Sequence, residues 1–205
     1  LGAKIKIKNG YIYASAKNGL KGAVIKFPSI SVGATESAIL AAVGAIGKTI
    51  ISNCAIEPEI QDMIFFLKKL GCNINFIGKR KISIVGTKVF KNVNHEIIFD
   101  RIELGTYIIA AALIGKKVNL LKVNPKIINT EIKILKKMGV RIKVKKKSIT
   151  VYETKKIKTA NIKTEPYPGF PTDLQAQIMV LMSKAKGISK IKENIFENRF
   201  MHVSE

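Results

Sequence analysis

A glycine motif that occurs three times divides the sequence into similar repeats. The copies are Leu1-Gly2-Ala3, Leu70-Gly71-Cys72 and Met138-Gly139-Val140, and they lie about 68 residues apart. After each glycine, apolar residues alternate with basic or polar ones on both sides of a short turn, which predicts a β-hairpin. The chain is therefore expected to be built from copies of one supersecondary unit.

Each repeat combines helices with strands. Before the second and third glycines, the periodicity predicts helices that begin near Pro58 and Pro125 and end at the motif. Further upstream, each repeat carries another helix followed by a strand. These pairs are expected at 35–46 and 49–53, at 105–114 and 118–123, and at 173–183 and 188–191. The order helix, strand, helix, two strands predicts an α/β fold.

The repeat is interrupted at both ends of the sequence. The chain begins on the last glycine of one repeat, and it stops at residue 205 before the third repeat reaches its second helix and hairpin. We therefore expect an internal part of a longer protein.

A rigid turn precedes the third of the upstream helices. Pro168 and Pro171 fix φ, and Gly169 permits a bend just before the helix begins. Asp173 is expected at the helix N-terminus, where the helix dipole favours an ionised carboxylate. A residue in this place is most often a helix cap. Two prolines and a glycine exceed what capping needs, and so the second interpretation is a general base.

Composition limits the classes of function. The net charge of +22 suggests nucleic-acid binding, because lysine binds a phosphate backbone without sequence preference. The lysines are spread along the chain, however, and no aromatic residues interleave with them as a stacking surface would need. We expect solvated lysines, such as Lys145-Lys146-Lys147 in a hairpin turn, that attract anionic substrates but not nucleic acid.

Neither a membrane segment nor a metal site is expected. The longest apolar run, 107–114, fits a buried helix, and the first residues lack a signal-peptide pattern, so we expect a cytoplasmic protein. Cys54 and Cys72 lack metal-ligand or CxxC spacing, and both are expected to be reduced and packed. His95 is expected to be a solvated strand residue.

Five motifs occur in a characteristic order. They are Ser31-Val32-Gly33-Ala34-Thr35, Glu57-Pro58-Glu59, Asp100-Arg101-Ile102-Glu103, Tyr167 to Gln177, and Phe196 to His202. Together they resemble the UDP-N-acetylglucosamine 1-carboxyvinyltransferase family of enolpyruvyl transferases. The resemblance extends over essentially the whole chain, as the middle portion of a sequence about twice as long.

This resemblance implies an inside-out α/β barrel of two domains, each built from three repeats of about 68 residues, with the active site between the domains. Residues 1–98 would belong to the first domain, which carries the catalytic loop, and residues 99–205 to the second. Both domains would be incomplete.

The implied reaction transfers the enolpyruvyl group of phosphoenolpyruvate to the 3-hydroxyl of UDP-N-acetylglucosamine, with release of phosphate. It is the first committed step of peptidoglycan precursor synthesis, and through cell-wall biogenesis it bears on cell shape and cell division. No metal and no organic cofactor are implied.

The resemblance also implies roles for single residues. The substrate-binding residues would be Ser31, Val32, Gly33, Asp173, Ile195 and Arg199. Asp173 would bind the sugar hydroxyl and take its proton, and residues 31–33 would hold the nucleotide diphosphate. The backbone at Ile195 would contact the amino sugar, and Arg199 would lie near phosphoenolpyruvate. Without the resemblance, residues 31–33 would be interpreted as an ordinary turn and cap, and Ile195 as a core residue. For Arg199, a surface salt bridge is an equally good interpretation.

Some positions depart from the family pattern. Ser29 stands where the family commonly has a lysine toward the nucleotide phosphates. The family's Lys-Asn pair and its loop with a proton-donating cysteine would precede Leu1, and two further arginines would follow Glu205. These parts of the same enzyme would be supplied by missing N- and C-terminal segments. We therefore expect this piece alone to be inactive.

Other residues and functions stay open. His202 is expected to line the cleft, and Arg101 to pair with one of the acidic residues that tie the repeats together. These acidic residues are Glu57, Glu59, Asp100 and Glu103. The alternative functions are a shikimate-pathway enolpyruvyl transferase relative, a nucleotide-sugar binding fragment without catalysis, and a basic nucleic-acid binder.

Overall fold

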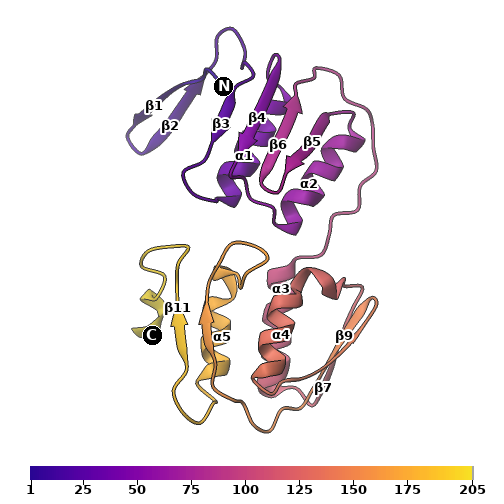
Figure 1. The fold of residues 1–205 in the computed structure, drawn as a ribbon, viewed down its shortest axis with the longest axis vertical. Helices are drawn as coiled ribbons and strands as arrows, with labels where there is room; N and C mark the ends of the chain where they lie inside the picture. Colours follow the sequence, from indigo (N-terminus) through magenta and orange to yellow (C-terminus); the bar gives the residue numbers. More distant parts are fainter. Residues whose placement is uncertain (205) are drawn as a thin grey trace. The chain divides into compact units, whose positions relative to one another are not determined.

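The chain divides into two compact units, Leu1–Ile98 and Phe99–Glu205, each with its own hydrophobic core (Figure 1). A computed structural model describes residues 1–204, and Glu205, the last residue of the predicted second domain, lies outside the described residues. The assignment of the two units to the domains of an enolpyruvyl transferase stays a prediction.

The first unit contains a hairpin and a four-stranded sheet. The hairpin strands β1 and β2 are antiparallel, and all of their residues are exposed. The larger sheet has the order β3-β4-β6-β5, in which β3 is parallel to β4 and the other pairs are antiparallel. The elements are β1 (Lys4–Lys8), β2 (Tyr11–Ser15), β3 (Val24–Lys26), α1 (Val32–Val43), β4 (Lys48–Ser52), α2 (Pro58–Lys69), β5 (Asn73–Gly78) and β6 (Lys81–Val85).

Both helices of the first unit pack on this sheet. Ile39 of α1 and Ile64 of α2 join Ile51, Ile82 and Ile84 of the strands in one buried core. Along β6 the buried residues alternate with more exposed ones, as expected for a sheet with one covered face.

The second unit contains a three-stranded antiparallel sheet and a pair of parallel strands. The sheet has the order β7-β9-β8, and β10 pairs with β11. The α-helices and strands are α3 (Arg101–Ile114), β7 (Lys117–Leu121), α4 (Asn129–Lys137), β8 (Arg141–Lys145), β9 (Ser148–Tyr152), β10 (Asn161–Lys163), α5 (Gln175–Met182) and β11 (Lys190–Lys192). Three short 3-10 helices are η1 (Pro125–Ile128), η2 (Thr172–Leu174) and η3 (Met201–Ser204).

Helix α3 lies at the centre of the second unit. It packs against both α5 and the sheet strand β9, and Ile108 of α3, Ile178 of α5 and Ile149 of β9 are fully buried in one core. The close approach of α3 to η2, the turn that leads into α5, depends on Gly105, because a Cβ atom at this position would overlap the side chain of Leu174.

The two units use the same supersecondary arrangements. The antiparallel order β4-β6-β5 of the first unit recurs as β7-β9-β8 in the second. A helix connects two parallel neighbours in each unit, since α1 lies between β3 and β4 in the sequence and α5 lies between β10 and β11. Buried residues at one common spacing occur in α1, in α3, and from the end of η2 through α5. They are Thr35, Ile39, Ala42, Val43; Leu104, Ile108, Ala111, Ala112; and Leu174, Ile178, Leu181, Met182.

The structure confirms the three predicted hairpins, including the lysine turn between β8 and β9. It corrects several boundaries. Helices α1 and α3 begin three to four residues earlier than predicted, because Ser31 and Asp100 accept hydrogen bonds from main-chain N–H groups of their first turns. The helix predicted from Pro125 begins as a 3-10 turn, and the three-residue strands β3 and β10 were not predicted.

The prediction for His95 is wrong. Its side chain is only 7% exposed, its Nε2 lies 3.1 Å from Oδ2 of Asp62, and its ring packs near Phe65 and Phe66. Residue 95 also lies outside any strand. The neighbouring aromatic pair of α2 shields the imidazole, which sequence alternation alone does not reveal.

Both cysteines are buried thiols, as predicted. Burial raises the pKa of Cys54 and of Cys72, so both thiols resist ionisation. Within residues 1–204, no helix has the length and apolar character needed to cross a membrane.

Candidate functional site

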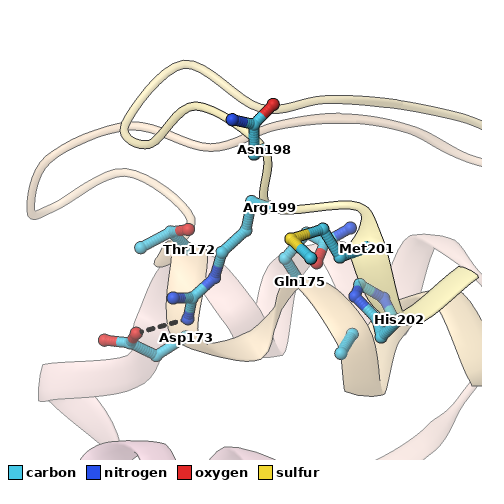
Figure 2. Close-up of a pocket in the computed structure, with 8 residues that line it drawn as sticks. Thr172, Asp173, Gln175, Asn198, Arg199, Met201 and His202 are labelled. Atoms are coloured by element: carbon cyan, nitrogen blue, oxygen red, sulfur yellow. Dashed lines mark hydrogen bonds and ion pairs between the residues drawn. The ribbon is translucent and has the colours of Figure 1, made fainter.

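A pocket of about 370 Å³ lies in the second unit, between the start of α5 and the segment that follows β11 (Figure 2). Its lining includes Thr172, Asp173, Gln175, Asn198, Arg199 and His202. The pocket thus contains Asp173 and Arg199, which the sequence predicted as site residues. It also contains His202, which was expected to line the cleft.

The parallel pairing of β10 and β11 explains why these residues meet. Lys163 and Lys192, the last residues of the two strands, are partners in the register. The segments that follow them therefore leave the sheet at the same edge. The carboxyl edge of parallel strands is where α/β proteins commonly bind ligands.

The segment after β10 is held by main-chain hydrogen bonds. The N–H of Glu165 donates to the carbonyl of Phe170 at 2.9 Å, and the N–H of Gly169 donates to the carbonyl of Pro166 at 2.9 Å. A Cβ atom on Gly169 would overlap the Glu165 side chain, and the hydroxyl of Thr130 donates to the Pro168 carbonyl at 2.6 Å. The turn before Asp173 is therefore constrained on several sides.

Asp173 does not act as a helix cap. It lies within η2, and neither η2 nor α5 has a side-chain hydrogen bond at its N-cap. The carboxylate Oδ1 instead accepts a hydrogen bond from Nη2 of Arg199 at 2.9 Å (Figure 2). Because the Asp173 side chain is 53% exposed, one face of the carboxylate remains open to a ligand.

Arg199 makes two contacts through its guanidinium group. Its guanidinium pairs with Asp173 and lies 5.6 Å from the centre of the Phe196 ring. The side chain is 39% exposed, and an ion pair this exposed contributes at most about 1 kcal/mol to stability. A planar guanidinium held so weakly can turn toward an anionic ligand.

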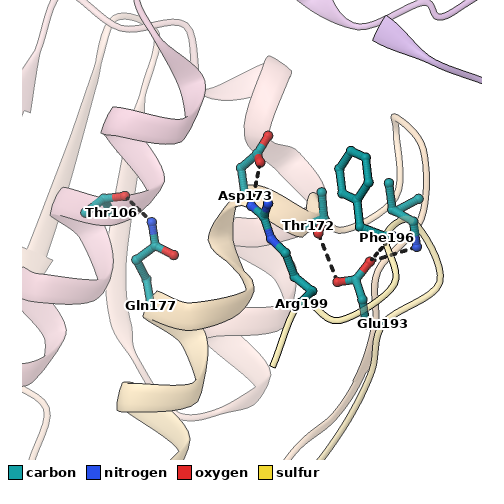
Figure 3. A network of polar contacts seen from close by, with 8 residues as sticks. Thr106, Thr172, Asp173, Gln177, Glu193, Phe196 and Arg199 are labelled. Carbon is teal, nitrogen blue, oxygen red and sulfur yellow. Dashed lines mark hydrogen bonds and ion pairs between the residues drawn. The ribbon is translucent and has the colours of Figure 1, made fainter. Parts of the chain in front are cut away.

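Glu193 organises the segment after β11 (Figure 3). Its Oε1 accepts from the N–H of Ile195 at 2.7 Å and from the N–H of Phe196 at 3.2 Å, and its Oε2 accepts from the Thr172 hydroxyl at 2.9 Å. Burial by itself would raise the pKa of Glu193, but these hydrogen bonds and one with the Thr164 side chain outweigh burial and lower it.

Ile195 is placed near the pocket residues by this network. Its main-chain N–H is already engaged by Glu193. A ligand that contacts the Ile195 backbone would therefore meet the carbonyl, which accepts hydrogen bonds.

Residues 31–33 lie in the first unit, at the start of α1. The Ser31 hydroxyl accepts from the N–H of Ala34 at 3.3 Å, and Gly33 is exposed, with no atom within 4 Å of the position of a Cβ. Ser29 is exposed just ahead of this helix. The structure thus brings Asp173, Ile195 and Arg199 together in the second unit, and it gives residues 31–33 a separate place in the first.

Sequence reasoning missed two polar groups of the second unit. Glu193 stands between a lysine and an asparagine in the sequence, a pattern typical of solvated surface. The second group is Glu131, whose carboxylate lies 3.8 Å from the guanidinium of the buried Arg101. Burial raises the pKa of Glu131, although a main-chain hydrogen bond and Arg101 oppose this effect.

Within residues 1–204, no group of three or more His, Cys, Asp or Glu side chains is arranged to hold a metal ion.

The sequence is similar to carboxyvinyltransferases over its whole length. Residues 1–205 match the family model for EPSP synthase (3-phosphoshikimate 1-carboxyvinyltransferase). The UDP-N-acetylglucosamine 1-carboxyvinyltransferase of Pelagibacter ubique (strain HTCC1062) is 58% identical over 205 residues, and that of Endomicrobium trichonymphae is 52% identical over 205 residues. Each match covers 100% of this chain and 49% of the relative. The chain thus spans about half the length of the curated relatives it matches.

Comparison with solved structures concerns the fold. The crystal structure of the enolpyruvyl transferase NikO from Streptomyces tendae superposes with a TM-score of 0.87 and 23% sequence identity. The match covers 99% of this chain and 51% of the NikO chain. The fold is therefore that of the enolpyruvyl transferases.

Proposed function

This chain belongs to the EPSP synthase (3-phosphoshikimate 1-carboxyvinyltransferase) family, and we propose that it is part of an enzyme that transfers an enolpyruvyl group. The acceptor is the 3-hydroxyl of UDP-N-acetylglucosamine, the donor is phosphoenolpyruvate, and phosphate is released. The reaction begins peptidoglycan precursor synthesis and thereby serves cell-wall biogenesis, cell shape and cell division. The observation that carries the proposal is the half-exposed Asp173 carboxylate at the pocket, next to the Arg199 guanidinium.

The names of the similar sequences favour the nucleotide sugar over shikimate 3-phosphate as the acceptor. The relatives that are 58% and 52% identical are both named for UDP-N-acetylglucosamine. The shikimate-pathway alternative is therefore not favoured.

Asp173 acts as the general base in this proposal. An alcohol adds to C2 of phosphoenolpyruvate only as its proton leaves, and the open face of the Asp173 carboxylate accepts that proton. A new C–O bond forms at C2 while an acid protonates C3. Loss of phosphate from C2 and a proton from C3 then regenerates the double bond in the product.

Other residues of the chain bind and orient the substrates. The exposed start of α1 at residues 31–33 receives the nucleotide diphosphate, because free N–H groups and the helix dipole attract anions. The Ile195 carbonyl accepts from the amino sugar. Arg199 exchanges its hydrogen bond with Asp173 for the carboxylate of phosphoenolpyruvate, which frees the base at the moment when substrate is bound.

We place the chain within an inside-out α/β barrel built from repeats of about 68 residues. Residues 1–98 and 99–205 are parts of its two domains. The recurrence of the β4-β6-β5 order as β7-β9-β8 supports this arrangement. The exposed β1–β2 hairpin supports it as well, because a two-stranded hairpin alone is marginally stable and needs a covering partner. N- and C-terminal parts of the same enzyme would supply that partner and the acid.

Phosphate release from the full-length protein tests the function. With phosphoenolpyruvate present, UDP-N-acetylglucosamine is expected to support turnover and shikimate 3-phosphate is not. The 205-residue chain alone is expected to show no turnover. Release with shikimate 3-phosphate only, or with neither acceptor, would contradict the proposal.

A further inference from the structure

We propose that Glu193 is a positioning residue of this site, whose carboxylate clamps the segment after β11 to the turn that carries Asp173. The consequence for catalysis rests on the proposed function above. The clamp itself rests on contacts within the second unit alone. The two parts of the proposal can therefore be tested separately.

The carboxylate joins two segments that lie far apart in the sequence. One oxygen, Oε1, accepts from the N–H groups of Ile195 and Phe196, and the other, Oε2, accepts from the hydroxyl of Thr172 (Figure 3). Thr172 immediately precedes Asp173. A single side chain thus sets the distance between the proposed base and the segment that carries the sugar-binding backbone.

The clamp is anchored to the end of β10. The N–H of Asn194 donates to Oγ1 of Thr164 at 2.9 Å, and Nδ2 of Asn194 donates to the Thr164 carbonyl at 3.2 Å. Thr164 is fully buried. Asn194, the residue beside Glu193, is therefore fixed to the core. This holds the main chain of Glu193 in place while its carboxylate contacts both segments.

The strength of the clamp follows from its charge. Hydrogen bonds from N–H groups to an ionised carboxylate are shorter and stronger than neutral ones, and the 2.7 Å contact with Ile195 has the length expected of such a bond. By comparison, the ion pair between Arg199 and Asp173 is exposed and contributes little to stability. Arg199 depends on the main chain ahead of it for its position, and Glu193 orders that main chain.

Kinetics of the full-length protein test the positioning role. Glu193→Ala is expected to raise KM for UDP-N-acetylglucosamine about tenfold or more, because Ile195 and Phe196 lose their shared acceptor. Glu193→Gln is expected to recover KM to within about threefold of the unmodified protein, since its carbonyl oxygen accepts from both N–H groups and its amide donates to the Thr172 hydroxyl.

Glu165→Ala is the matched control. Its carboxylate belongs to the turn before Asp173 and pairs with Lys163 of β10, and both side chains are at least half exposed. This variant is expected to keep the KM of the unmodified protein. A Glu193→Ala variant with unchanged KM, or a Glu165→Ala variant with the same rise, would overturn the positioning role.

Amide hydrogen exchange tests the clamp without reference to the reaction. Exchange at Ile195 and Phe196 is expected to be about tenfold faster or more in Glu193→Ala, and unchanged in Glu165→Ala. Unchanged exchange in Glu193→Ala would overturn the clamp. If the unmodified protein releases no phosphate, the proposed function fails, while the exchange result still decides the clamp.

A milder variant covers the case in which Glu193→Ala does not fold. Thr172→Val removes only the hydroxyl that donates to Oε2 and keeps the shape of the side chain. It is expected to raise KM for the nucleotide sugar and to speed exchange at Ile195, each by less than the loss of the whole carboxylate. If Thr172→Val leaves both KM and the exchange at Ile195 unchanged, the proposal is wrong.

Discussion

Two carboxylates close to the pocket are held in opposite ways. Glu193 is engaged through both oxygens by main-chain and hydroxyl donors, whereas Asp173 accepts one hydrogen bond and remains half exposed. A carboxylate that is saturated with donors is a poor proton acceptor, because these hydrogen bonds stabilise its ionised form. We therefore propose Asp173, and not Glu193, as the base, and Glu193 as the residue that positions the neighbouring segment.

Asp173→Asn in the full-length protein tests this assignment. Turnover is expected to fall by a factor on the order of a hundred or more, since the amide cannot accept the proton of the sugar hydroxyl. The fold is expected to survive, because the change removes only an exposed ion pair. Phosphate release and circular dichroism measure the two effects.

The control for this variant is Glu165→Gln, which makes the same chemical change at an exposed carboxylate of the same turn. It is expected to leave turnover unchanged. Normal turnover in Asp173→Asn would reduce Asp173 to a partner of Arg199 in a surface ion pair.

At the scale of elements, the contact between α3 and α5 fixes the helix that follows Asp173. Leu174, the last residue of η2, is buried just ahead of α5 and fits against the bare backbone of Gly105 in α3. The amide of Gln177 also donates to the Thr106 hydroxyl at 3.0 Å. The start of α5 therefore depends on a helix that begins more than 70 residues earlier, at Arg101.

Gly105→Ala is expected to destabilise the second unit by about 1–3 kcal/mol, because the added methyl group overlaps the Leu174 side chain. The free energy of unfolding from urea titrations measures the change. Gly33→Ala is the control, since no atom lies within 4 Å of that Cβ position. Helix propensity predicts for it a gain of up to about 1 kcal/mol. Equal losses in both variants would argue against the packing explanation.

At the scale of the whole molecule, the dominant feature is the net charge of +22. Lysines lie in elements of both units, including exposed strands such as β1 and β8. A charge of this size raises the local concentration of anionic substrates. It does not by itself form a nucleic-acid site, which also needs ordered phosphate and base contacts.

We expect the chain to show no binding to a short single-stranded DNA at micromolar concentration and about 150 mM salt. Weak association is expected to emerge only at low salt, where counterion release favours it. Fluorescence anisotropy across a salt series provides the measurement. Micromolar affinity that persists at about 150 mM salt, with a steep dependence on salt, would support the basic-binder alternative instead.

Much of the secondary structure could be predicted because the signals are local. Alternation of apolar residues over a few positions predicted the hairpins, and prolines and glycines marked the start of α2 and its end. The errors arose where a boundary depends on a cap or on a distant partner. Ser31 and Asp100 begin their helices through side-chain hydrogen bonds, and β3 exists only because it pairs with β4.

The candidate site was also predictable only where its signals are local. The motifs around Asp173 and Arg199 are visible in the sequence, but the contact between these residues joins positions 26 apart along the chain. No local pattern identifies Glu193, whose importance comes from hydrogen-bond partners such as Ile195, Phe196 and Thr172 that the fold brings to it. Long-range contacts depend on the path of the chain between them, and periodicity over a few residues does not contain that path.

By itself, the sequence determined the α/β class, the repeated hairpins, the resemblance to enolpyruvyl transferases and the identity of the candidate base. Only the tertiary structure decided that Asp173 pairs with Arg199 instead of capping its helix, and that Glu193 holds the neighbouring segment. The physical reason is the parallel pairing of β10 with β11. It brings the two following segments to one edge of the sheet, where their side chains can meet.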